Sequence, residues 1–214
     1  MGLREKKKRQ NREALILAAR ALFEEQGYHN TQMEEIAARA GVSTATAYNY
    51  FESKANVMTA IALRHVRSAL PARRALLAAL PPDPVEGIIA YERLLAQQTM
   101  NTLGKRGWRV IFQAAYDLPP SNLTRSGKLF SRSIARHYQK MFKTYRSRGR
   151  LRPDTDIDLA TELITMVGTE YFSRFIMSET MSVDTLIGYI PAYAEVVLAP
   201  WLLPAGDQGV SGSG

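Results

Sequence analysis

The spacing of small residues between positions 33 and 51 predicts two short helices joined by a sharp turn. Helices that cross at a steep angle need a small residue where they approach, and Ala37 supplies it. Four positions later, Gly41 can adopt the positive φ that the turn requires. Val42 can then plug the turn, and Ala47 can face back into the same small core. This spacing is typical of a helix-turn-helix, whose second helix can enter the DNA major groove.

The second helix of this motif carries very small side chains at its N-terminal end, namely Thr44, Ala45 and Thr46. Small side chains let a helix backbone approach the base edges, Thr hydroxyls can bond to bases, and methyl groups can pack on thymine. Farther along, Tyr48 and Tyr50 combine a flat ring with a hydroxyl that can reach a phosphate oxygen. The same spacing is also compatible with a generic three-helix core that binds no DNA.

The helix starts around the motif offer further phosphate contacts. Ser53 and Lys54 begin the next helix, where free backbone N–H groups and a cation favour a phosphate. Thr31, at the start of another helix, can contribute in the same way. The candidate DNA-binding residues in and around the motif are Thr31, Ser43, Thr44, Ala45, Thr46, Tyr48, Asn49, Tyr50 and Lys54.

Positive charge is concentrated at the N-terminus. The chain has a formal net charge of +8, and residues 1–12 hold six basic side chains against the single acidic Glu5. A basic terminal segment favours a polyanionic partner, nucleic acid first and an anionic membrane surface second. A solubilising tail is the alternative. We expect a double-stranded DNA operator and no membrane partner, and we add Lys7 and Arg9 to the candidate DNA contacts.

Apolar residues recur at helical spacing along most of the chain, and the alternating runs typical of strands are missing. We therefore expect an all-α fold. The expected helices cover about 11–26, 32–39, 44–50, 54–70, 85–103, 108–117, 121–148, 156–178 and 183–199. Thr31 and Glu34 match a capping box. Pro71 predicts a kink or an end in its helix, and Pro191 predicts the same in the last helix.

These elements divide into an N-terminal three-helix head and a larger C-terminal helical bundle. The expected domains are an arm with the helix-turn-helix over 1–52, a connecting helix over 53–71, a ligand-binding and dimerisation bundle over 72–203, and a disordered tail over 204–214. At ~1.5 Å per residue the connecting helix is roughly 25 Å long, which is enough to link two layers of a protein.

Few residues are suited to catalysis or metal binding. The chain has no cysteine, and its three histidines, His29, His65 and His137, lie far apart in the sequence. We find no metal-ligand cluster or nucleophile motif, so we expect neither an enzyme nor a cofactor. No apolar run reaches the ~18 residues of a membrane span, and the N-terminus lacks the apolar stretch of a signal peptide. We therefore expect a soluble, cytoplasmic protein.

Residues 12–58 resemble the N-terminal domain of the TetR family of bacterial transcriptional regulators. Three stretches carry the resemblance, ALFEEQGY, TQMEEIAARAGVS and AYNYFESK. It implies an all-helical homodimer in which each protomer has a helix-turn-helix head and a bundle with a small-molecule pocket and the dimer interface. Family members usually repress transcription from a palindromic operator and release it when their ligand binds.

The resemblance also implies roles for single residues. Thr44, Ala45 and Thr46 would approach bases. The backbone contacts of the family would fall on Thr31, Tyr48, Tyr50 and Lys54. This sequence departs from the family at Ala47, where a larger aliphatic residue is frequent, and at Ala55, where an acidic residue is common. These departures leave the base sequence that is read open.

The bundle would hold a small apolar or aromatic ligand, because aromatic and thioether side chains suit an adaptable pocket. The candidate ligand-binding residues are Trp108, Phe112, Tyr116, Phe130, His137, Tyr138, Met141, Met166 and Tyr171. Each of them can equally be an ordinary core residue. The basic residues between Arg125 and Arg152 fit one solvated face of a long helix.

The last two helices carry a broad apolar stripe and predict a homodimer surface. The candidate interface residues are Leu159, Leu163, Val167, Gly168, Tyr171, Phe175, Ile187, Ile190, Val197 and Leu198. The alternative is that these helices close the core of their own protomer. We therefore expect a homodimeric repressor released by a small molecule, and the alternative is a DNA-binding protein of the same fold without a small-molecule switch.

Overall fold

The structure is a computed structural model that describes residues 2–113 and 122–203. Within these ranges the regular elements are helices, apart from one antiparallel bridge between Leu151 and Leu202, so the all-α prediction is confirmed. The helices are α1 (Leu3–Glu25), α2 (Met33–Arg39), α3 (Thr44–Tyr50), α4 (Lys54–Ala78), α5 (Pro84–Thr102), α6 (Gly104–Gln113), α7 (Asn122–Ser147), α8 (Ile157–Met177), α9 (Val183–Gly188) and α10 (Ile190–Leu198). Among the described residues, no helix is long and apolar enough to cross a membrane.

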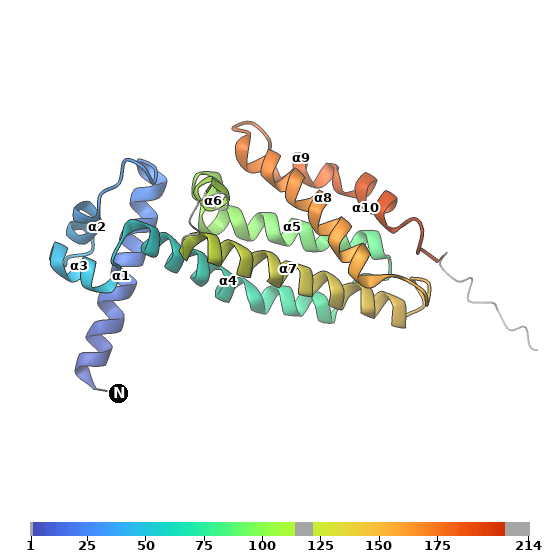
Figure 1. The fold of residues 1–214 in the computed structure, drawn as a ribbon, viewed down its shortest axis with the longest axis horizontal. Helices are drawn as coiled ribbons and strands as arrows, with labels where there is room; N and C mark the ends of the chain where they lie inside the picture. Colours follow the sequence, from blue (N-terminus) through green and yellow to red (C-terminus); the bar gives the residue numbers. More distant parts are fainter. Residues whose placement is uncertain (1, 114–121, 204–214) are drawn as a thin grey trace, which may run out of the picture. The chain divides into compact units, whose positions relative to one another are not determined.

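The helices α1, α2 and α3 form the N-terminal three-helix head (Figure 1). α2 packs against both α1 and α3. The apolar residues of α1 recur at intervals of three and four, so one face of this helix is buried. The buried side chains of the head are Leu15, Ile16, Ala18, Ala19, Leu22, Phe23, Met33, Ile36, Ala37, Ala47 and Phe51.

α1 begins at Leu3, well before the predicted start at residue 11. The residues between are mostly Lys, Arg, Gln and Glu, which are good helix formers, and they include neither Gly nor Pro. The basic N-terminal segment is therefore the surface of a helix and not an extended arm.

The start of α2 differs from the prediction by one residue. Its N-cap is Gln32, which forms a capping box with Glu35 in place of the predicted pair of Thr31 and Glu34. The Glu35 carboxylate accepts the Gln32 backbone N–H at 2.7 Å. Thr31 is fully buried instead, and its hydroxyl donates to the Gly27 carbonyl at 2.8 Å. Because the Thr31 hydroxyl is bonded to the Gly27 carbonyl of the loop, Gln32 caps α2 instead.

The two prolines within helical stretches have different effects. α4 continues through Pro71 to Ala78 and does not end near residue 70, because the Ala and Arg residues beyond Pro71 favour helix. Pro191 lies in the first turn of α10, where its missing N–H removes no helical hydrogen bond. The predicted single helix over 183–199 is therefore two helices, α9 and α10.

The chain divides into two compact units. Unit 1 comprises residues 1–71, 96–131 and 176–179. Unit 2 comprises residues 72–95, 132–175 and 180–214. α4, α5, α7 and α8 contribute residues to both units. In unit 1, α6 packs against α1 of the head.

Unit 2 is a helical bundle whose apolar core receives side chains from α4, α5, α7, α8, α9 and α10 (Figure 1). Tyr145 of α7 is fully buried, and its hydroxyl donates to the carbonyls of Pro81 and Asp83, at 3.0 and 3.2 Å. These bonds attach α7 to the segment before α5. Gly87 lies against the Tyr145 ring, and its lack of a side chain leaves room for the hydroxyl.

Several polar side chains of unit 2 are buried or half-buried. The Tyr91 hydroxyl and His137 Nδ1 share a hydrogen bond of 2.7 Å, and the Tyr138 hydroxyl donates to the Glu92 carboxylate. Arg73 is fully buried. Burial, followed by the nearby charge of Arg73, lowers the pKa of His137 to about 4. His137 is therefore neutral at physiological pH.

Gly87→Ala should destabilise the protein, although alanine normally favours a helix. A Cβ at this position would overlap the Tyr145 hydroxyl and would lie 2.9 Å from Tyr145 Cζ. Because two carbonyls hold the hydroxyl in place, we expect the free energy of unfolding in urea to fall by about 1–3 kcal/mol.

Two further variants make this measurement specific. Gly188→Ala should change the stability by less than about 0.5 kcal/mol, because a Cβ there meets nothing within 4 Å. In a Tyr145→Phe background, Gly87→Ala should cost less, because the overlapping oxygen is gone. An equal cost in both backgrounds would contradict the proposed clash.

The lowered pKa of His137 predicts a loss of stability on acidification. An unperturbed histidine titrates near pH 6.5, whereas the folded-state pKa of His137 is about 4. Between these values the unfolded chain binds more protons, so the free energy of unfolding falls as the pH is lowered from about 6.5 toward about 4. His137→Asn should therefore lose less stability than the wild type between about pH 7 and pH 5 in urea denaturation. Identical pH dependence in the wild type and His137→Asn would refute the assignment.

Candidate nucleic-acid interface

The turn between α2 and α3 has the geometry that the sequence predicts. Ala37 and Ala47 are 1% and 0% exposed, so no bulky side chain separates the two helices. Gly41 has a φ of +69°, and the Val42 N–H donates to the Ala37 carbonyl at 3.1 Å. α3 spans Thr44–Tyr50, as predicted. The predicted helix-turn-helix is therefore confirmed as a structure.

α3 presents small and polar side chains at the surface. Its exposed residues are Ala45, Tyr48 and Asn49, and its half-buried residues are Thr44, Thr46 and Tyr50. Because Ala47 alone is buried in this helix, almost the whole outer face of α3 is open to a partner. Short side chains at its N-terminal end leave the backbone accessible.

The start of α3 is fixed by Ser43. The Ser43 hydroxyl oxygen accepts the Thr46 backbone N–H at 3.2 Å, so Ser43 is the N-cap of α3. The Ser43 and Thr46 hydroxyls also share a hydrogen bond of 2.8 Å. The cap therefore engages both hydroxyls, while the Thr44 side chain takes no part in it.

Phe51, which follows α3, is buried in the head, whereas the side chain of Tyr48 is exposed. Phe51 is 4% exposed, and the Arg12 guanidinium of α1 lies 5.1 Å from the centre of its ring. Tyr48 is 43% exposed, and its hydroxyl lies 3.5 Å from Glu34 Oε1, at the limit of a hydrogen bond. The hydroxyl of Tyr48 is therefore only weakly held within the protein.

Lys54 lies in an environment that differs from the predicted phosphate contact. Its ammonium donates to the carbonyls of Tyr28, His29 and Thr31, at 2.6, 3.2 and 2.8 Å. It also lies 4.5 Å from the centre of the Tyr28 ring. An ammonium has three N–H donors, and the three carbonyls accept all of them. The structure thus assigns Lys54 an internal contact instead of a free cation.

Thr31 is also internal and does not line the surface of the head. Its hydroxyl donates to a loop carbonyl, and Gln26 Nε2 lies 3.4 Å from the same hydroxyl oxygen. Gln26 donates to the Glu35 carboxylate at 3.0 Å as well. No sequence pattern indicates Gln26 or Glu35, because these two residues meet only after the loop has folded.

The two basic residues chosen from the N-terminal segment, Lys7 and Arg9, are exposed on α1. Their backbone is helical, so their side chains leave a regular surface. Helical order reduces the conformational entropy that such residues lose when they bind a phosphate. Both remain available as candidate DNA contacts.

Two candidate ligand-binding residues of unit 1, Trp108 and Phe130, pack around a histidine that the sequence did not single out. His65 is fully buried, and its Nδ1 lies 2.8 Å from the Thr102 hydroxyl. Trp108 and Phe130 pack around it, with ring centres 4.8 to 6.0 Å apart in this group of three. Phe112 is half-buried. A lone histidine on a helix has no sequence pattern that would reveal such a cluster.

The other candidate ligand-binding residues do not join this cluster. Those in unit 2 are His137, Tyr138, Met141, Met166 and Tyr171, and the first two belong to its group of polar side chains. Met166 is 62% exposed and therefore lies at the surface, and Tyr116 lies outside the described residues. In the described ranges, no group of three or more His, Cys, Asp or Glu side chains is placed to hold a metal ion.

The candidate dimer residues divide between the surface and the core of unit 2. Leu159 and Leu163 are exposed. Val167, Tyr171 and Val197 are half-buried. Buried residues are Gly168, Phe175, Ile187, Ile190 and Leu198. For these five the prediction needs correction, because they pack inside their own protomer.

Three exposed apolar side chains on or next to α8 and α10 were not among the predicted dimer residues, namely Met166, Tyr189 and Val196. Met166 follows Leu159 and Leu163 at helical spacing on α8, so the spacing could have indicated it. At α10, Tyr189 and Val196 are 43% and 75% exposed. Tyr189 precedes α10 directly and is separated from Val196 by two helical turns.

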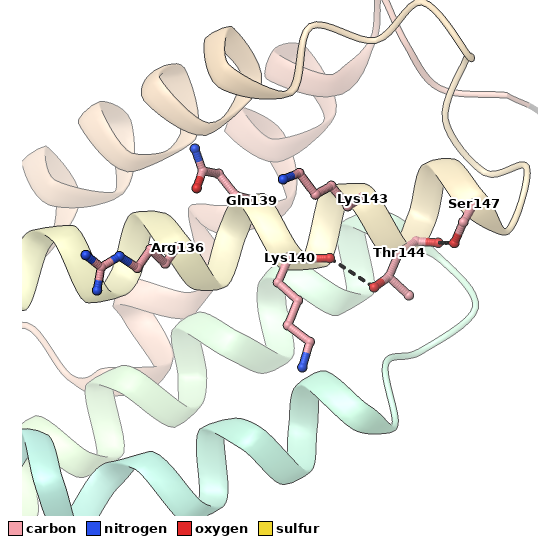
Figure 2. Close-up of a pocket in the computed structure, with 6 residues that line it drawn as sticks. All are labelled: Arg136, Gln139, Lys140, Lys143, Thr144 and Ser147. Carbon is pink, nitrogen blue, oxygen red and sulfur yellow. Dashed lines mark hydrogen bonds between the residues drawn. The ribbon is translucent and has the colours of Figure 1, made fainter.

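One face of α7 in unit 2 carries exposed basic side chains (Figure 2). Arg136, Lys140 and Lys143 lie at the surface, as expected of a solvated helix face. The residues drawn in Figure 2 all come from this one helix, and they line a shallow surface hollow. The hollow is therefore open on the side that faces away from α7.

The head matches a family of known proteins. The family model for bacterial regulatory proteins, tetR family, matches residues 15–61. The HTH-type transcriptional activator FasR of Mycolicibacterium smegmatis is 32% identical over 111 residues, which cover 52% of this chain and 49% of FasR. The chain therefore spans about half the length of this curated relative.

Solved structures of lower identity share the fold over most of the chain. Thermus thermophilus FadR, a TetR-family transcriptional repressor in complex with lauroyl-CoA, has a TM-score of 0.64 at 22% identity, with coverage of 92% of this chain and 97% of FadR. The triclosan complex of SmeT, the repressor of the Stenotrophomonas maltophilia multidrug efflux pump SmeDEF, has a TM-score of 0.69 at 21% identity, with coverage of 91% and 93%. The head, residues 15–61, therefore matches the model of the tetR family of bacterial regulatory proteins, and the fold shared with these structures extends over most of the chain.

Proposed function

We propose that this protein regulates transcription by inserting α3 into the major groove of an operator. The exposed, small-residue face of α3 carries the proposal. Ala45 is exposed at the N-terminal part of this helix, where base contacts concentrate in helix-turn-helix proteins. Ala37 and Ala47 fix the helix to the head by close packing, so it can enter the groove without rearrangement. The names of the relatives, which are HTH-type regulators, support the proposal.

The remaining contacts of the proposed interface are with the DNA backbone. The Tyr48 hydroxyl, at the edge of the exposed face, suits a phosphate oxygen. Lys7 and Arg9 add positive charge from α1. Such contacts hold the protein in register, while Thr44 and Ala45 face the base edges and determine which sequence is read.

We further propose that the protein acts as a homodimer through α8 and α10. Leu159, Leu163 and Met166 form an exposed apolar stripe on α8. Tyr171 of the same helix stacks with Tyr189 at 5.1 Å, which brings α8 next to the start of α10. A twofold axis through such a surface would pair like residues, and it would place two heads for a palindromic operator with half-sites about 34 Å apart.

The finer proposal is a repressor that a small apolar or aromatic ligand releases from DNA. SmeT and FadR, which share the fold, are named as repressors and were solved with triclosan and lauroyl-CoA. The enclosed aromatic and polar groups around His65 and around His137 are the candidate regions for such a ligand. A ligand would release DNA only in so far as it prefers a conformation that binds DNA poorly.

The second candidate function is DNA binding without a small-molecule switch. The observation that favours it is the filling of the predicted pocket residues: Trp108, Tyr138 and Met141 are all buried against other side chains. A thermal-shift screen with hydrophobic compounds, followed by DNA release, separates the two functions. A compound that raises the melting temperature and lowers DNA affinity supports the small-molecule switch. If no compound in the screen does both, the result supports DNA binding without a switch.

The proposed backbone contacts predict a change in the salt dependence of DNA binding. Lys7→Gln combined with Arg9→Gln should lower the slope of log K against log salt by about 1.8, because each lost phosphate contact removes about 0.9. The slope is measured by fluorescence anisotropy between about 50 and 200 mM salt, on a duplex enriched from a random library.

The matched control replaces exposed cations of α7. Arg136→Gln with Lys140→Gln removes the same charge from a helix face to which we assign no DNA contact. Its slope should equal that of the wild type. If the two double variants reduce the slope equally, the effect reflects net charge and the contacts assigned to α1 are wrong.

The proposed dimer predicts the effect of a charge on the α8 stripe. Met166→Glu should weaken self-association at least about tenfold, because a carboxylate would have to be desolvated between two apolar surfaces. Sedimentation equilibrium measures the change. Leu17→Glu, at an exposed leucine of α1, is the control and should leave the mass distribution unchanged. A dimer of wild-type strength in Met166→Glu would place the interface elsewhere.

A further inference from the structure

The carbonyls around Lys54 form a half-buried site for one ammonium group. The oxygens of Tyr28, His29 and Thr31 all lie within 3.2 Å of Nζ. The Tyr28 ring, 4.5 Å away, adds a favourable cation–π contact. With three donors satisfied by three acceptors, Nζ has no N–H left for a DNA phosphate. A phosphate could bind Lys54 only if the loop lost these bonds.

The loop that Lys54 holds connects α1 to α2, and Lys54 itself belongs to α4. The first loop residue that Lys54 binds, Tyr28, packs its ring at 5.2 Å from Phe23, which lies in the buried face of α1. The last one, Thr31, directly precedes Gln32, the N-cap of α2. Lys54 itself is the first residue of α4. One side chain therefore joins the end of α1, the start of α2 and the start of α4.

The chemistry of this site requires an ammonium. Backbone carbonyls that converge in a partly buried place repel one another unless a donor neutralises them. A neutral side chain would leave all three without this partner. Arginine would keep the charge, but its planar fork cannot direct three N–H groups at three carbonyls around one point. Lysine is the residue that meets both conditions.

From this geometry we propose that Lys54 is a positioning residue that locks the loop before α2 to the first turn of α4, and that it acts on DNA affinity only through this lock. The inference rests on the proposed function for its effect on DNA. The lock itself is a property of the DNA-free protein. A shift of the first turn of α4 would pull on the three carbonyls and so move the start of α2.

Hydrogen exchange on the full-length, DNA-free protein tests the lock directly. In Lys54→Met, which keeps the aliphatic stem, the backbone amides of Thr31 and Gln32 should exchange at least about tenfold faster than in the wild type. Lys54→Arg should show the same direction of change, because it cannot reproduce the three bonds. Lys7→Met is the control for loss of a lysine and should leave these amides unchanged.

The salt dependence of binding to the enriched duplex separates the lock from a phosphate contact. Lys54→Met should weaken binding with an unchanged slope of log K against log salt, whereas Lys7→Met should lower the slope by about 0.9. If Lys54 were a phosphate contact, Lys54→Met would lower the slope by about 0.9 and leave the exchange of the loop amides unaltered. That result would overturn the inference.

The test of the lock still gives an answer if Lys54→Met does not fold or if the protein enriches no DNA duplex. If Lys54→Met does not fold, Lys54→Arg decides: wild-type exchange in that variant would refute the lock, and faster exchange supports it. If no duplex is enriched, the proposed DNA binding fails while the exchange data still decide whether the lock exists.

Discussion

The close approach of α2 and α3 is the constraint on which the rest of the head depends. It requires the two alanines, Ala37 and Ala47, at the contact and Gly41 in a backbone conformation that other residues rarely adopt. The methyl groups of Ala37 and Ala47 make the apolar contact between α2 and α3. The outer face of α3 can therefore consist of short side chains without loss of the core. One side of α3, a helix of only two turns, therefore packs in the head and stabilises it, while the other side is exposed.

Polar side chains of the head follow the same division. Lys54 and Thr31 direct their donors inward to loop carbonyls, while Tyr48 and Asn49 are exposed. A basic or hydroxyl residue near a recognition helix is thus not automatically a DNA contact. The deciding observation is whether its hydrogen-bonding capacity is already used within the protein.

Whether a feature could be predicted from the sequence depended on how far apart in the chain the interacting residues lie. The Gly41 turn, the Ser43 cap and the bounds of α3 were predictable because each is determined within a few residues. The role of Lys54 was not, since its partners lie more than twenty residues away. The same holds for the buried Phe175 and Ile190, whose apolar character fits a core and an interface equally well.

The most direct measurement of the central claim is selection of DNA from a random library by the wild type and by Ala45→Asn. Asparagine can form a bidentate contact with adenine, which alanine cannot. The account predicts that the wild type enriches an inverted repeat with half-sites about 10 base pairs apart, and that Ala45→Asn changes one base preference in each half-site while the spacing stays the same. Enrichment of the same sequence by both proteins, or of none by the wild type, would contradict the placement of α3 in the major groove.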